Sequence, residues 1–240
     1  MKPKTIGIVG GMSPESTVLY YQTIVRRHFA ERGDHFYPRI VVASVSFGRY
    51  IELQHAGDWA GVAEGLAGEF RAVAAAGADF ALLAANTMHK VLGEARPPLP
   101  VLSIFDAVAR EAKRLGRTRL GLTGTRFTMS DGFYARGLEA RGLGVVVPEP
   151  AEQDEVHRII YDELIAGRVL PASRARFTEI AQALVARGAD AVLLGCTELE
   201  ILMANATLPF PLLPSAALHA GLAWEIAVGA APMPPPPSSV

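Results

Sequence analysis

The feature of this sequence that most constrains its fold is a segment that occurs twice, at residues 77–87 and 188–198. Each copy begins with Gly-Ala-Asp, continues with a short apolar run and ends in a turn of small and polar residues. An apolar run of this length, bounded by a glycine and such a turn, is typical of a buried strand. The offset of 111 residues therefore indicates a chain built from two similar α/β halves.

A second repeat supports the duplication. Residues 6–11, Ile-Gly-Ile-Val-Gly-Gly, resemble residues 120–125, Leu-Gly-Leu-Thr-Gly-Thr, at an offset of 114. Chance likeness between βαβ units is the alternative, but two pairs of segments at nearly equal offsets favour duplication. We expect an α/β fold of two pseudo-symmetric parallel-sheet subdomains, with the active site in the cleft between them. The predicted subdomains are residues 1–104 with 211–229, and residues 105–210.

The only cysteine of the chain, Cys196, lies in the turn of the second copy. In an open α/β sheet, ligands bind at the carboxyl ends of the strands, so a thiol at this position is well placed for chemistry. A buried, unreactive cysteine is the alternative. A helix expected to begin at Thr197 would bring its amino end to the thiol and lower the thiol pKa below about 8.5. The matching position in the first copy is Ala85.

Composition excludes several classes of protein. The formal net charge of −1 over 240 residues gives no basic surface for nucleic acid or a membrane. A single cysteine forms neither an internal disulfide nor a thiolate zinc site, and the six histidines lack metal-ligand spacing, so we expect no metal. Because we find neither a signal peptide nor an apolar run of about 18 residues, we expect a cytoplasmic protein. The proline-rich segment 230–240 is predicted to be disordered.

In the first half, the glycine turn after the first strand leads into a helix. Ser13 is a good N-cap, Pro14 suits the first helical position, and Gly33 is the expected stop. The amino end of this helix can hold a compact anion, which makes Gly11, Met12 and Ser13 candidate substrate-binding residues. The glycine spacing is not that of a dinucleotide fingerprint, so we expect no nucleotide.

Two candidates lie in the segment 46–54, which we expect to be a loop entering a helix. Arg49 can form a bidentate pair with an acidic substrate group, although a solvated surface arginine is the alternative. Gln54 is a second substrate-binding candidate in this segment.

The turn at residues 85–90 is expected to open another helix. Asn86 and Thr87 are cap-type residues that can bind helix N–H groups and a substrate carboxylate together. His89 is either a general base or a histidine packed into the core below the turn.

In the second half, the turn 123–128 carries Thr125 and Thr128 and is the counterpart of the first glycine turn. Beyond it we expect a helix at 130–141, a strand at 144–147, an acidic loop at 149–155 and helices at 155–166 and 171–187. A strand at 210–213 and a helix at 215–228 complete the chain, and we expect them to pack back on the first half.

Five of these segments together resemble the aspartate/glutamate racemase family, the pyridoxal-independent amino-acid racemases. They are Gly-Gly-Met-Ser at 10–13, Asn-Thr-Met-His-Lys at 86–90, Gly-Thr-Arg-Phe-Thr at 124–128, Gly-Cys-Thr-Glu at 195–198 and Ala-Ala-Leu-His-Ala at 216–220. The resemblance covers essentially the whole chain except the proline-rich end. It implies two pseudo-symmetric subdomains, no cofactor, a small amino acid or carboxylic acid as substrate, and a homodimer.

The resemblance also implies two thiols, one on each face of the substrate α-carbon, of which one removes a proton and the other returns one. Cys196 matches the second-half thiol. Ala85 stands where the family has a cysteine or, in one branch, a threonine, and losing such an acid or base typically costs about 10²–10⁴ in rate. Water, Thr87 or His89 would have to act instead. The family's lysine for an acidic side chain is matched by Ile165.

Three functions remain open. The first is an amino-acid racemase or epimerase with catalytic Cys196, in which preorganised donors bind the substrate. The candidate substrate-binding residues are Gly11, Met12, Ser13, Arg49, Gln54, Asn86, Thr87, Thr125, Thr128, Thr197 and Glu198. The second is a one-thiol decarboxylase, lyase or cis–trans isomerase of a small carboxylic acid, and the third is a catalytically impaired protein that binds such acids. The intact Gly-Cys-Thr-Glu segment argues against the third, and the resemblance favours the first.

Overall fold

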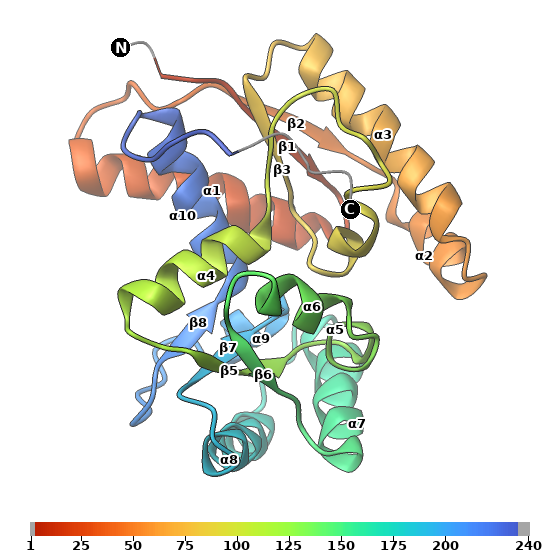
Figure 1. Cartoon of the computed structure of the whole chain (residues 1–240), viewed down its shortest axis with the longest axis vertical. Helices are drawn as coiled ribbons and strands as arrows, with labels where there is room; N and C mark the ends of the chain where they lie inside the picture. The colour runs from red at the N-terminus through yellow and green to blue at the C-terminus, as the bar shows by residue number, and fades with distance from the viewer. Residues whose placement is uncertain (1–2, 235–240) are drawn as a thin grey trace. The chain divides into compact units, whose positions relative to one another are not determined.

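The structure, a computed structural model, describes residues 3–234 and consists of two compact units. One unit is the chain up to Ile104 and from Ala216 onward, and the other is Phe105–Ser215. Each unit is built around a single sheet with helices packed against it (Figure 1). Of the segment 230–240 predicted to be disordered, residues 235–240 lie outside the described residues.

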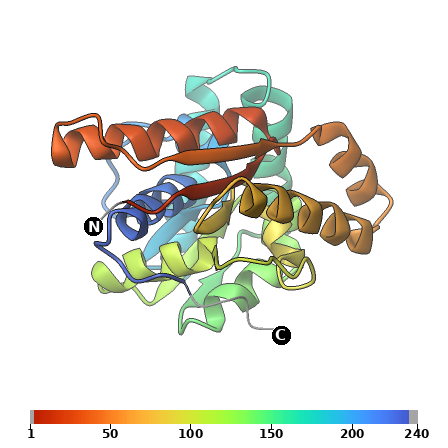
Figure 2. The same cartoon turned by 90° about the horizontal axis from the view of Figure 1, so that it is seen from above.

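The first unit holds a parallel sheet with the strand order β2-β1-β3-β4. Its elements are β1 (Ile6–Gly10), α1 (Pro14–Arg32), β2 (Ile40–Ser44), α2 (Phe47–His55), α3 (Trp59–Ala75), β3 (Phe80–Leu83), the 3₁₀ helix η1 (Thr87–Val91), β4 (Val101–Leu102) and, from Ala216 on, α10 (Ser215–Ala227). Helices α1 and α3 lie on opposite sides of this sheet (Figures 1 and 2).

The second unit repeats this plan with the strand order β6-β5-β7-β8, again all parallel. Its elements are α4 (Ile104–Arg114), β5 (Arg119–Thr123), α5 (Arg126–Ser130), α6 (Phe133–Glu139), β6 (Gly144–Val146), α7 (Pro150–Arg158), the π-helix η2 (Ile159–Leu164), α8 (Pro171–Ala186), β7 (Ala191–Leu194), α9 (Thr197–Leu202) and β8 (Leu212–Pro214). The predicted α/β fold of two similar parallel-sheet halves is therefore confirmed.

The aspartate of the repeated Gly-Ala-Asp motif makes the same kind of hydrogen bond in both sheets. The carboxylate of Asp79 accepts a hydrogen bond from the N–H of Thr5 at 2.6 Å, and that of Asp190 accepts one from the N–H of Thr118 at 2.7 Å. Each aspartate thus ties the start of the third strand to the start of the first. The glycine two residues earlier has a φ of 89° in one copy and 97° in the other, a backbone conformation that favours glycine.

The last strand corrects one prediction. We expected residues 210–213 to pack back on the first half, but β8 pairs with β7 in the second sheet, with Leu213 opposite Leu193. Its counterpart β4 pairs with β3 in the same way, so the duplication extends to the fourth strand. The chain returns to the first unit only at Ala216, five residues after the predicted boundary at 211.

Two predicted helices also differ from the structure. The helix expected at 130–141 is shorter in the structure, where α6 begins at Phe133 after Gly132, which has a φ of 83°, and a separate short helix, α5, ends at Ser130. The segment 149–155, expected as a loop, belongs mostly to α7. Pro150 takes the first helical position, and the N–H of Glu149 donates to the side chain of Glu152 at 2.8 Å, which starts the helix early.

Within residues 3–234, no helix is both long enough and apolar enough to cross a membrane. The first two residues of the segment 230–240, which was predicted to be disordered, form backbone hydrogen bonds in the structure. The backbone N–H groups of Ala230 and Ala231 both donate to the carbonyl of Glu225.

Candidate active site

Two turns lie side by side at the carboxyl ends of β5 and β7. The N–H of Gly195 donates to the carbonyl of Thr123 at 2.9 Å. A side chain at Gly195 would put its Cβ 2.5 Å from that oxygen and 3.1 Å from Cγ2 of Thr128, so the close approach requires glycine. The hydroxyls of Thr125 and the fully buried Thr128 lie 3.3 Å apart. The structure thus brings both threonines next to the turn that carries Cys196.

Cys196 is half-buried and occupies the N-cap position of α9. Its Sγ donates to Oε2 of Glu198 at 2.7 Å. The hydroxyl of Thr197, which is 7% exposed, donates to the same oxygen at 2.9 Å. One carboxylate oxygen therefore accepts from both side chains, and Cys196 and Glu198 form what we call the thiol–carboxylate pair.

The protonation of this pair differs from the prediction made for the thiol. Burial, and then the negative charge of Glu198, raise the pKa of Cys196 well above its ordinary value, so the expected lowering is wrong. Helix α9 has only six residues, and its first turn carries the carboxylates of Glu198 and Glu200, which outweigh a short helix dipole. Near neutral pH Cys196 is therefore a thiol.

Tyr161, on η2, is a residue near the pair that sequence reasoning missed. Desolvation raises the pKa of its hydroxyl, and the negative charges of a Cys196 thiolate and of Glu198 raise it further, which keeps the phenol protonated. Its ring lies 4.4 Å from the ring of His157, and the side chain is 49% exposed. No sequence motif indicates Tyr161. It comes near the pair on a π-helical turn, which residue spacing does not predict.

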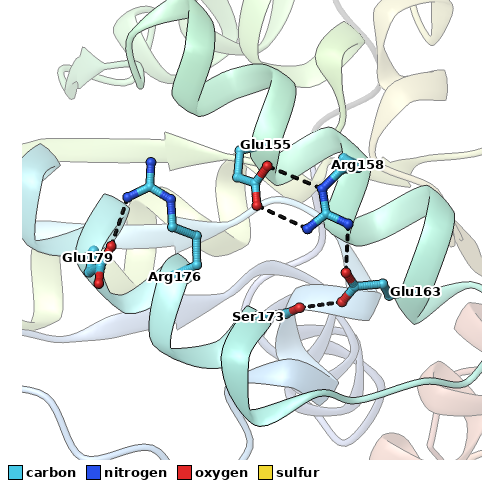
Figure 3. Close-up of polar contacts among 6 residues, drawn as sticks. All are labelled: Glu155, Arg158, Glu163, Ser173, Arg176 and Glu179. Atoms are coloured by element: carbon cyan, nitrogen blue, oxygen red, sulfur yellow. Dashed lines mark hydrogen bonds and ion pairs between the residues drawn. The ribbon is translucent and has the colours of Figure 1, made fainter.

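A buried carboxylate holds that turn in place (Figure 3). Glu163 is 7% exposed, accepts from Nη1 of Arg158 at 2.7 Å and also accepts from the hydroxyl of Ser173. Arg158 in turn pairs with Glu155 through its other nitrogens. These bonds join α7, η2 and α8, and they lower the pKa of Glu163. Single π-turns occur frequently at functional sites, and this one packs against α9.

In the first unit, Gly11, Met12 and Ser13 lead into α1. Ser13 is the N-cap of α1, as predicted, and its hydroxyl accepts from the N–H of Ser16 at 3.4 Å. The N–H of Gly11 donates to Oγ1 of Thr17 at 2.7 Å, and Met12 is only 6% exposed within the core. These groups stabilise the first turn of the helix, and their predicted role in binding substrate stays a prediction.

The segment 46–54, expected to be a loop entering a helix, is helical from Phe47 onward, so the helix begins near the start of the segment. Helix α2 forms here because one face is apolar, with Tyr50 4% exposed against the core. Arg49 lies on α2 and is exposed. The side-chain amide of Gln54 donates to Sδ of Met88 at 3.8 Å, which brings Gln54 next to the turn after β3.

That turn opens only the short 3₁₀ helix η1, with Asn86 before it and Thr87 as its first residue. His89 is 6% exposed. Its Nδ1–H donates to the carbonyl of Ala85 at 2.8 Å, and its Nε2 accepts from the N–H of Ile104 at 3.1 Å. Because a general base needs an available lone pair, these two bonds support the structural alternative for His89.

The comparisons with known proteins bear on this site. A family model described as Asp/Glu/Hydantoin racemase matches residues 9–223. The chain belongs to this racemase family. A candidate Asp/Glu racemase from Yersinia pestis is 36% identical, with a TM-score of 0.88 over 94% of this chain and 99% of that chain.

Two further racemase relatives extend the comparison. An aspartate racemase homologue from Pyrococcus horikoshii OT3 is 34% identical, with a TM-score of 0.84 over 94% of this chain and 99% of that chain. A glutamate racemase from Desulforudis audaxviator (strain MP104C) is 32% identical over 130 residues, which are 52% of this chain and 46% of that enzyme. Membership of the racemase family supports a racemase or epimerase activity on small amino acids.

Proposed function

We propose that this protein is a cofactor-independent amino-acid racemase or epimerase in which Cys196 exchanges the proton at the substrate α-carbon. The observation that carries the proposal is the 2.7 Å hydrogen bond from Cys196 Sγ to Glu198 Oε2, at the carboxyl end of a strand in a racemase-family chain. A thiol bonded to a carboxylate can both give and take a proton. A homodimer and a cytoplasmic location stay predictions.

The thiol–carboxylate pair supplies the base without a change in net charge. Transfer of the thiol proton to Oε2 of Glu198 leaves a thiolate and a carboxylic acid that share one proton. The thiolate then removes the α-proton: the Cα–H bond breaks, the S–H bond forms, and the freed electron pair spreads into the substrate carboxylate. Burial and the charge of Glu198 disfavour a second negative charge at this place, which favours transfer within the pair over release of the proton to solvent.

Hydrogen-bond donors close to the pair support the developing charge. Thr125, Thr128 and Thr197 belong to the two turns around Cys196, and preorganised donors of this kind stabilise carbanion-like transition states. We propose that they bind the α-carboxylate together with Asn86 and Thr87. The remaining candidates of the first unit are Gly11, Met12, Ser13, Arg49 and Gln54.

The second proton transfer needs a group other than Ala85, since a methyl group carries no exchangeable proton. The hydrogen bonds of His89 count against it, so we propose that Thr87 or a water molecule acts on that face. The methyl side chain of Ala85 and the two hydrogen bonds of His89 also favour a second candidate function, a one-thiol decarboxylase, lyase or cis–trans isomerase. A decarboxylase breaks a C–C bond to leave a carbanion, which needs one proton from Cys196. A protein that only binds such acids is a third.

The proposal is tested by α-proton exchange in D₂O across a panel of L- and D-amino acids, followed by NMR and chiral analysis. Racemisation predicts deuterium incorporation with inversion, and Cys196→Ala should abolish it. Incorporation with retained configuration would mean that one face works alone. No exchange with any member of the panel would refute the racemase proposal, and release of CO₂ from small dicarboxylic acids would then support the second candidate.

A further inference from the structure

Two buried histidines of the first unit, His89 in η1 and His219 in α10, lie next to each other. Their ring centroids are 5.7 Å apart with an angle of 62° between the planes. His89 is 6% exposed and His219 is fully buried. Buried polar side chains are retained where hydrogen bonds satisfy them, so the partners of these two rings indicate what the rings hold.

His219 binds two elements of the first unit. Its Nε2 lies 2.9 Å from the carbonyl of Leu102, and because a carbonyl only accepts, Nε2 carries the proton. Its Nδ1 is then the acceptor for the hydroxyl of Tyr20 in α1, also at 2.9 Å. The ring therefore joins α10, α1 and the end of β4.

His89 binds the next peptide group of the same junction. Its Nε2 accepts from the N–H of Ile104, while its Nδ1–H donates to the carbonyl of Ala85. The carbonyl of Leu102 and the N–H of Ile104 belong to the peptide groups on either side of Ser103. The two histidines thus hold successive peptides of the β4–α4 junction, and His89 connects this junction to the turn after β3.

The hydrogen bonds of the sheet hold the β4–α4 junction and the turn after β3 only weakly. Strand β4 has two residues, and it pairs with β3 only through Ala81 with Val101 and Leu82 with Leu102. The 3₁₀ helix that follows the turn has five residues, and such helices have poorer hydrogen-bond geometry than α-helices. The turn at 85–87 therefore depends on side-chain bonds for its position.

We propose that His89, supported by His219, is a positioning residue that holds Asn86 and Thr87 where they meet the substrate carboxylate. The inference rests on the proposed function, since it assigns a purpose to these two residues within it. His89 acts through the Ala85 carbonyl, one residue before Asn86, and does not itself exchange a proton. His219 holds the β4–α4 junction through the carbonyl of Leu102, and the same junction binds His89 through the N–H of Ile104.

Two variants separate positioning from simple core stability, because they keep different bonds. In His89→Asn the side-chain amide reaches the place of Nδ1 and can still donate to the carbonyl of Ala85. In His89→Gln the amide oxygen reaches the place of Nε2 and can still accept from Ile104. Only His89→Asn preserves the bond to the turn.

Positioning predicts that His89→Gln raises the KM of α-proton exchange about tenfold, the equivalent of one lost buried hydrogen bond, whereas His89→Asn stays within about threefold of the wild type. Urea unfolding of both variants accounts for any loss of fold. Equal KM values for the two variants would overturn the positioning role, because a purely structural histidine affects both alike.

A separate measurement keeps this test distinct from a failure of the proposed function. If the wild type exchanges no α-proton, amide hydrogen exchange of residues 85–91 still reports the turn in the substrate-free protein. Faster exchange in His89→Gln than in His89→Asn would support the positioning role, and equal rates would overturn it. Alkylation of Cys196, the single thiol and in the other unit, should be unchanged in both variants.

Discussion

Mild acid should destabilise this protein through His219. Burial, and then the neighbouring His89, lower the pKa of His219 from 6.5 to about 3, against the opposing effect of its bond to the carbonyl of Leu102. The side chains that face the ring are Tyr20 from α1 and His89 from η1, and neither supplies a negative charge that would stabilise an imidazolium. Protonation would also break the bond in which Nδ1 accepts from Tyr20.

The sign and size of the effect follow from proton linkage. The unfolded chain binds a proton at His219 near pH 6.5 and the folded chain only near pH 3, so stability falls as the pH drops through this range. Between pH 7 and pH 5 the loss is about 2 kcal/mol, and the total loss, reached only below pH 3, is about 5 kcal/mol. Carboxylates such as Asp34 and Glu163, whose pKa values are lowered, stay ionised between pH 7 and 5 and do not mask the effect.

The assay is urea unfolding of the wild type and His219→Gln at pH 7, 6 and 5. The glutamine amide reaches the place of Nε2 and can still donate to the carbonyl of Leu102, but it does not titrate. We expect the free energy of unfolding of the wild type to fall by about 2 kcal/mol more than that of the variant between pH 7 and 5. His35→Gln, at an exposed histidine, controls for the substitution itself. Equal pH dependence of wild type and His219→Gln would refute the reasoning.

Three further predictions concern the turns of the two halves. Ala85→Cys should raise the racemisation rate about 10²-fold or more by chiral analysis, and no gain would count against Ala85 as the missing acid or base. Glu198→Gln removes a negative charge that raises the pKa of Cys196, so the pH profile of Cys196 alkylation should move to lower pH. The rate of α-proton exchange should fall about 10²-fold. An unchanged alkylation profile would contradict the interaction between Cys196 and Glu198. Gly195→Ala should cost about 1–3 kcal/mol in urea unfolding, because its Cβ would lie 2.5 Å from a carbonyl oxygen of β5. As a control, Gly48→Ala in α2, whose new Cβ has no neighbouring atom within 4 Å, should be neutral or slightly stabilising.

The sequence predicted what local pattern and repetition determine. Apolar runs bounded by glycines predicted the strands of both sheets, and several of these glycines have a positive φ in the structure. The duplicated segment located Cys196 at the end of β7. The partner of β8 could not be read locally, because strand pairing depends on residues far apart in the chain. Comparison with β4 would have found it, since the two strands hold equivalent places in the two sheets.

The chemistry of the site was harder to predict than its location. The helix rule for thiols predicted a lowered pKa for Cys196, but the side chain of Glu198 turns back to accept from Sγ, and burial adds to its effect. Tyr161 reaches this region on a π-turn that depends on Glu163 and Ser173, ten residues apart. Such side-chain geometry is not encoded in residue spacing.

The thiol–carboxylate pair has a consequence for the chemical durability of the protein. Peroxides and disulfides react with thiolates, and the ladder of cysteine oxidation begins from that form. Cys196 is a half-buried thiol beside the negative charge of Glu198, so its thiolate is scarce in the resting protein. The environment that we propose for proton transfer therefore also protects the only thiol of the chain from oxidation in air.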